Sequence, residues 1–163
     1  MILRMGSERL DLPAEIARMH GIPRRVYEHW CRVAALEDGI PTLEAFQLKA
    51  VAYADPYISL VGVEEDPRRY RMLRVGEDLI SHYGADFSGK CLDELDVRNI
   101  NAIIELDNDI VATRTPIAAL VTIGLLGIPI IRLNGIGVPL VDETGRISHI
   151  VACTTREMFG FGV

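Results

Sequence analysis

The chain has 163 residues, 49% of them hydrophobic and 25% charged, which is enough for one compact core and too few for two full domains. Its formal net charge is −6 and no run of Lys or Arg exceeds two residues, so neither nucleic acid nor an anionic membrane is an expected partner. Three scattered cysteines, and the charged residues Arg4, Glu8 and Arg9 where a signal peptide needs an apolar run, predict a reduced, cytoplasmic protein.

The first forty residues are predicted to be helical. Residues 12–21 form one expected helix, and Pro23 opens a second helix. In the second helix Val26, Trp30 and Val33 share one face at three- and four-residue spacing. We expect this face to pack on the rest of the chain or on the same helix of a second copy, and we predict that these three residues form an interaction surface.

A strand hairpin is predicted in the next part of the chain. Residues 42–54 predict a short helix that leads into an extended segment, and Asp55-Pro56 then breaks the chain. Residues 57–63 are apolar and β-branched without a helical period, and residues 70–75 alternate apolar and polar types. The charged turn between these two strands makes them an antiparallel pair.

The strongest amphipathic helix is predicted for residues 96–113. Its apolar residues fall on one face, with the acids and amides opposite, and they are Val97, Ile100, Ile103, Ile104, Ile110 and Val111. A shorter helix is expected at residues 77–83, between two glycines.

Three strands are predicted at the C-terminal end, over residues 117–124, 129–141 and 147–155, with a turn at residues 142–145. Residues 115–131 carry no charge over seventeen positions. This is short of the about 20 apolar residues of a spanning helix, and prolines and glycines interrupt it, so we predict two buried strands instead. The order of elements predicts an α+β architecture, one antiparallel sheet with helices on one face.

Residues 70–95, YRMLRVGEDLISHYGADFSGKCLDEL, carry a distinctive glycine pattern. An aromatic-rich strand ends in Gly76, a second glycine follows at Gly84, and an acid, an apolar residue and a serine then precede Gly89. With the later stretch VPLVDETGRI, this pattern resembles the PAS domain, and more closely the single-domain PAS family common in alphaproteobacteria, over residues 26–157. The chain departs from that family at Leu73 and Glu77, where an Arg and a Thr are usual.

The resemblance implies a five-stranded antiparallel sheet with flanking helices. It places an N-terminal helical segment at residues 1–41 and a PAS-like sensory domain at residues 42–163. It also implies a signalling role without catalysis, through a small-molecule ligand, a homodimer or a signalling protein such as a histidine kinase. The ligand-binding residues predicted from the resemblance are Tyr70, Met72, Ile100, Ile104, His149 and Cys153.

Chemical motifs are few. The glycines at residues 76, 84 and 89 fit neither a P-loop nor a dinucleotide fingerprint, so we interpret them as turn residues. Cys91 lacks the neighbouring amides of flavin-binding PAS domains, and the long helix lacks the histidine of haem-binding ones, so both cofactors are disfavoured and the cofactor stays unassigned. No histidine pair has metal-ligand spacing, so no metal is predicted. The alternative hypotheses are a small α+β enzyme that uses Cys91 or His82, and a structural adaptor without a ligand.

Overall fold

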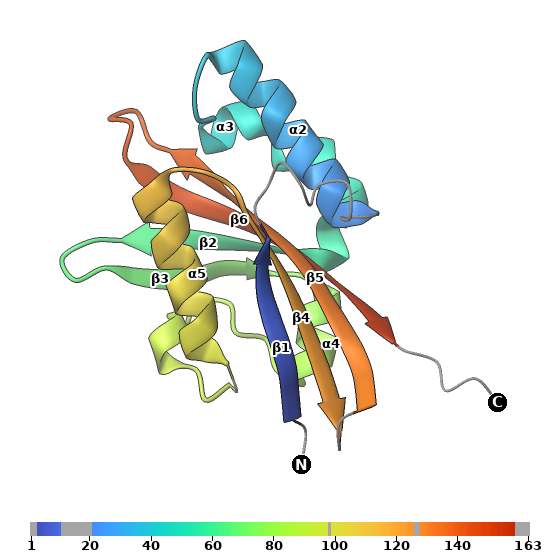
Figure 1. Cartoon of the computed structure of the whole chain (residues 1–163). Helices are drawn as coiled ribbons and strands as arrows, with labels where there is room; N and C mark the ends of the chain where they lie inside the picture. The colour runs from blue at the N-terminus through green and yellow to red at the C-terminus, as the bar shows by residue number, and fades with distance from the viewer. Residues whose placement is uncertain (1–2, 11–20, 98, 126–127, 159–163) are drawn as a thin grey trace.

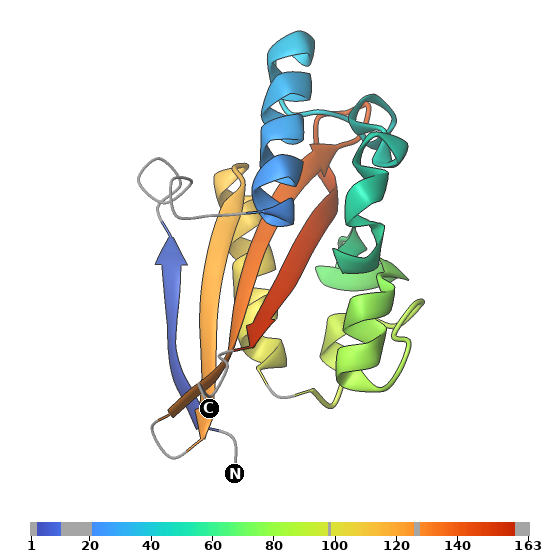
Figure 2. The same ribbon diagram turned by 90° about the vertical axis from the view of Figure 1, so that its right-hand side faces the viewer.

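The structure, a computed structural model, describes residues 3–10, 21–97, 99–125 and 128–158. The helix predicted at residues 12–21 therefore lies almost entirely outside the described residues. One antiparallel sheet, whose strands differ in length, forms the centre of the molecule, and helices pack on both of its faces (Figures 1 and 2).

The sheet has the strand order β1-β4-β5-β6-β2-β3. Its strands are β1 (Leu3–Leu10), β2 (Ile58–Glu64), β3 (Arg69–Val75), β4 (Ile117–Leu125), β5 (Ile128–Val141) and β6 (Ile147–Met158). All neighbouring strands pair antiparallel. The predicted α+β class, the five strands β2 to β6 and the β2–β3 hairpin are confirmed.

Strand β1 corrects the prediction that the first forty residues are helical. It pairs with β4, from Leu3 opposite Gly124 to Leu10 opposite Ala118. The physical reason is non-local: an edge strand presents unpaired N–H and C=O groups, and residues 3–10 supply partners for those of β4. A helical period in the local sequence carries no information about such a pairing.

Helices cover both faces of the sheet, which corrects the prediction that they lie on one face. In β2 the successive residues Leu60 and Val61 are both buried, as are Ile150 and Val151 in β6. Because neighbouring side chains of a strand point to opposite faces, both faces must be covered. In Figure 2, α2 (Ile22–Glu37) lies in front of β5 and β6, and α5 (Ile100–Thr113) lies behind them.

Helix α2 packs on its own chain. It begins after Gly21 with proline in its first turn and ends at Asp38, which has a left-handed backbone conformation. Val26 is fully buried, and the Trp30 Nε1–H donates a hydrogen bond of 2.8 Å to the Pro139 carbonyl of β5. The hydrogen bond from Trp30 to Pro139 crosses the predicted domain boundary at residue 41. The boundary itself remains a prediction.

Short helices connect α2 to the hairpin. Helix α3 (Leu43–Phe46) is capped by Thr42, whose hydroxyl accepts a hydrogen bond of 3.1 Å from the Ala45 N–H. The extended segment predicted next is instead the 3-10 helix η1 (Leu48–Tyr57). The segment kinks at Val51, and Val51 and Ala54 are both fully buried.

The three motif glycines have structural roles, as the turn interpretation predicted. Gly76 precedes α4 (Glu77–Tyr83), and a Cβ at this position would lie 2.3 Å from the Pro56 carbonyl oxygen. Gly84 ends α4 at a φ of 71°, and Gly89 has a φ of 86°, both in the left-handed region that favours glycine. A short 3-10 helix, η2 (Leu92–Glu94), then leads towards α5.

Candidate functional site

A cavity of about 210 Å³ lies between the sheet and the helices α4 and α5. Its lining is almost entirely apolar and includes Leu79, Phe87, Leu92, Ile103, Ile110 and Ile117. This is the concave, mostly apolar kind of space in which proteins bind small molecules, although it is smaller than a typical drug-sized pocket.

Two glycines of β5 help to form the cavity. Gly135 and Gly137 both line it, because residues two apart in a strand face the same side. A Cβ at Gly137 would lie 2.5 Å from Cδ1 of Ile110, so helix α5 can approach the sheet here only because the strand lacks a side chain. These two glycines were not among the predicted site residues, although glycines at two-residue spacing inside a strand are a signal of close approach.

Asp107 is the one carboxylate in the lining described by the structure. It is 6% exposed and lies on the same face of α5 as Ile103 and Ile110, four residues after the first and three before the second. Burial away from water raises the pKa of its carboxyl to about 7. The prediction that all acids of this helix lie opposite its apolar face is therefore wrong for Asp107.

The other polar groups of the lining differ in their bonding. The Ser59 hydroxyl on β2 is buried and has no hydrogen-bond partner among the described residues. His82 on α4 accepts a hydrogen bond of 3.0 Å at Nδ1 from Arg156, which also forms an ion pair of 2.8 Å with Asp78. Burial, and then the Arg156 charge, lower the pKa of His82, so the imidazole is neutral at neutral pH.

The predicted ligand-binding residues lie in several places. Met72 and Ile100 line the cavity. Tyr70 and Ile104 belong to the apolar cluster on the same side of the sheet, and the Tyr70 hydroxyl donates a hydrogen bond of 2.6 Å to Asn108. Cys153 is buried on the α2 side, and His149 on β6 has its Nδ1 at 2.9 Å from the Ser148 hydroxyl. The ligand-binding role of all six remains a prediction, while Ser59 and Asp107 were missed.

The predicted interaction residues also differ in burial. Val26 belongs to the core on the α2 side, Trp30 packs against that core, and Val33 is half-buried. Their role in binding a partner remains a prediction.

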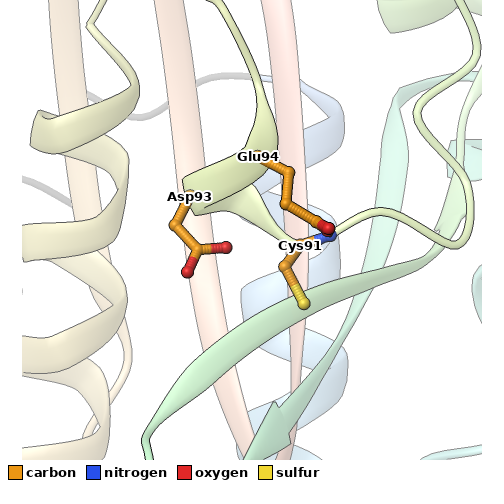
Figure 3. A group of neighbouring side chains, drawn as sticks. All are labelled: Cys91, Asp93 and Glu94. Carbon is orange, nitrogen blue, oxygen red and sulfur yellow. The ribbon is translucent and has the colours of Figure 1, made fainter.

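Cys91 lies beside two acidic residues, Asp93 and Glu94, at the start of η2 (Figure 3), and the possible ligand atoms of the three lie within 4.8 Å of one another. Both carboxylates already have partners. Glu94 accepts a hydrogen bond of 2.6 Å from the Cys91 backbone N–H, and Asp93 accepts two, of 2.8 and 3.0 Å, from Arg69. Because the Arg69 charge opposes a cation here, we propose no metal at this cluster.

The Cys91 thiol is not an activated nucleophile. It is fully buried, and burial raises its pKa even though Arg69 and Arg71 act in the opposite direction. A nucleophilic cysteine needs a lowered pKa, because the thiolate is the reactive form. This geometry weakens the alternative hypothesis of an enzyme that uses Cys91.

No helix within the described ranges has both the length and the apolar character needed to cross a membrane. No family model matches the chain, and no curated protein is similar to it in sequence. Among solved structures, the PAS domain from Bordetella pertussis BvgS is similar to this chain, with a TM-score of 0.41 and 20% sequence identity. The similarity covers 74% of this chain and 86% of that one.

Proposed function

We propose that this chain is a PAS-like sensory module that binds a small ligand in the cavity between its sheet and the helices α4 and α5. The observation that carries the proposal is the cavity itself, an apolar space of about 210 Å³ inside an otherwise packed domain. Protein interiors have few voids larger than a water molecule, so a space of this size needs an explanation, and a ligand is the simplest one.

Helix α4 is the element best placed to respond to a ligand. None of its residues is fully buried, yet Leu79, His82 and Tyr83 line the cavity. Its attachment to the sheet includes the ion pair between Asp78 and Arg156 of β6. A ligand that contacts α4 would shift the populations of its docked and undocked states, and a partner protein would detect that shift.

The signalling partners are part of the same proposal. We propose that the chain acts in the cytoplasm as a homodimer and passes its signal to a protein such as a histidine kinase. The three cysteines are free, as a reducing compartment requires.

Native mass spectrometry of freshly purified protein tests the ligand and the dimer together. We expect a stoichiometric bound mass that is lost on denaturation. The variant Ala152→Leu, which places a larger side chain in the cavity lining, should lose this mass. Ala35→Leu, the same change at an exposed position of α2, should retain it.

Two observations together would contradict the ligand-binding role. If the protein carries no bound mass and added benzene causes no NMR chemical-shift changes at cavity residues, the ligand-binding role is lost. The remaining hypothesis would then be an adaptor that acts through protein contacts alone.

A further inference from the structure

Two polar groups in the cavity lining have no hydrogen bond to another described residue. Asp107, on α5, is 6% exposed, and its described interaction is electrostatic, with Tyr70. The hydroxyl of Ser59, on β2, is buried and equally without a partner among the described residues. One group belongs to the helical wall of the cavity and the other to the sheet wall.

Such an arrangement is costly for the folded protein alone. A buried polar group without a hydrogen bond destabilises the fold, and a buried carboxylate without a counter-charge does so more strongly. Leucine or asparagine at position 107 would avoid the charge. An acid in such an apolar cavity is a candidate for a functional site, at which a ligand would supply the missing partner.

The charges around the cavity define the kind of head group. No Lys or Arg is among the described residues of the lining, and the imidazole of His82 already accepts a hydrogen bond from Arg156. The acceptor is therefore a buried carboxyl group with no cation in the described lining beside it, and a bound cation would favour its charged form. A protonated amine is the complement, because it provides both positive charge and hydrogen-bond donors.

The size and lining define the rest of the ligand. A cavity of about 210 Å³ is somewhat larger than the roughly 150 Å³ cavity that accommodates benzene, so it holds on the order of ten non-hydrogen atoms. The rings of Tyr83 and Phe87, whose centroids are 5.8 Å apart, belong to the lining. Aromatic faces attract cations as well as apolar groups.

We propose that the cavity binds a small apolar monoamine, whose ammonium group is held by Asp107 and, through a second hydrogen bond, by Ser59, while its apolar body fills the space between α5 and the sheet. This rests on the proposed function, and it adds the chemical class of the ligand.

Three probes of similar size test the proposal by isothermal titration calorimetry at neutral pH: 2-phenylethylamine, its neutral analogue 2-phenylethanol, and the anion phenylacetate. They are titrated into the full chain and into Asp107→Asn, Asp107→Leu, Ser59→Ala and Glu105→Gln. Glu105→Gln is the matched control, because Glu105 is an exposed acid on the same helix. Thermal denaturation of each variant establishes that it is folded.

The wild-type protein should bind the amine about tenfold or more tightly than the alcohol, since a hydrogen bond to a charged group contributes roughly that factor. Asp107→Asn and Asp107→Leu should abolish this preference, Ser59→Ala should weaken amine binding about fivefold, and Glu105→Gln should change neither.

Equal binding of the amine and the alcohol, or a preference for phenylacetate, would overturn the assignment of an amine and leave the ligand-binding function intact. The same holds if both Asp107 variants keep the preference for the amine. If none of the three probes binds, the amine assignment fails, and the proposed function is then decided separately by the bound mass and the benzene shifts described above.

Discussion

Asp107 illustrates how a single residue can combine a cost to stability with a proposed role in binding. Its position on α5 continues the apolar face of Ile103 and Ile110, so the helix can pack only by taking the carboxyl group out of water. Burial raises the pKa of Asp107 because removing the carboxylate from water destabilises its charged form, and the site therefore favours the neutral acid.

The substitution Asp107→Asn should therefore stabilise the protein in a pH-dependent way. The folded-state pKa is about 7, whereas the ordinary value is 3.8, so between these values the folded state keeps a proton that the unfolded state has lost. Wild-type stability thus falls as pH rises through this window. Asparagine does not titrate, so the variant should gain on the order of 4 kcal/mol over wild type above about pH 7 and almost nothing near pH 4.

Urea denaturation of both proteins from about pH 4 to about pH 8 measures this gain. Other titrating groups, such as His82 and His149, are common to both proteins and cancel in the difference. Glu105→Gln should show no comparable pH-dependent gain. A difference between Asp107→Asn and wild type that is constant with pH would contradict the placement of Asp107 in a water-free site.

At the scale of elements, α2 is held to the sheet by a few contacts of unequal weight. Val26 is fully buried, and Trp30 combines apolar packing with the hydrogen bond to Pro139. Val33, on the predicted common face, is only half-buried. The helix therefore docks mainly through residues 22–30.

Truncating these residues should give unequal losses of stability. Val26→Ala should lower the free energy of unfolding by on the order of 2 kcal/mol, because it leaves a gap in the packed core. Val33→Ala should cost about 1 kcal/mol or less. Chemical denaturation followed by the fluorescence of Trp30, the single tryptophan, measures both. Equal losses at the two positions would mean that α2 docks along its whole length.

The elements that could be predicted from sequence are those with local causes. The β2–β3 hairpin, the short helix ended by Gly84 and the turn at residues 142–145 follow from alternation and turn chemistry within a few residues. Strand β1 was missed, because its pairing with β4 joins segments more than a hundred residues apart. Helical packing on both faces of the sheet was also missed, although the apolar runs at residues 60–63 of β2 and 150–153 of β6 are a signal for it.

The candidate site was predicted only in part for a similar reason. Met72 and Ile100 could be placed near it from the pattern of the resemblance. Asp107 could not, because a helical pattern assigns acids to the solvent face by default. The space at Gly135 and Gly137 depends on how closely α5 approaches β5, which is a tertiary distance.

At the scale of the whole molecule, two apolar clusters share one sheet. The cluster on the α2 side includes Val26 and Cys153, and the cluster on the α5 side includes Ile110 and Ile150. Because β2, β4 and β6 contribute buried side chains to both clusters, neither cluster can be lost while the other remains intact. The chain should therefore unfold as one cooperative unit, including α2 from the predicted N-terminal segment.

Site-resolved thiol labelling tests this cooperativity. Cys153 is buried on the α2 side of the sheet and Cys91 is buried beside β3, so their reactivities report on separate parts of the fold. Across a urea series, mass spectrometry of the labelled protein should show both thiols becoming reactive at the same midpoint. The fluorescence of Trp30 should change at that midpoint too, because α2 and the sheet separate in the same transition. If Trp30 changed at a lower urea concentration than both thiols, residues 1–41 would be a separate unit docked on an independently stable domain, and the boundary at residue 41 would gain direct support.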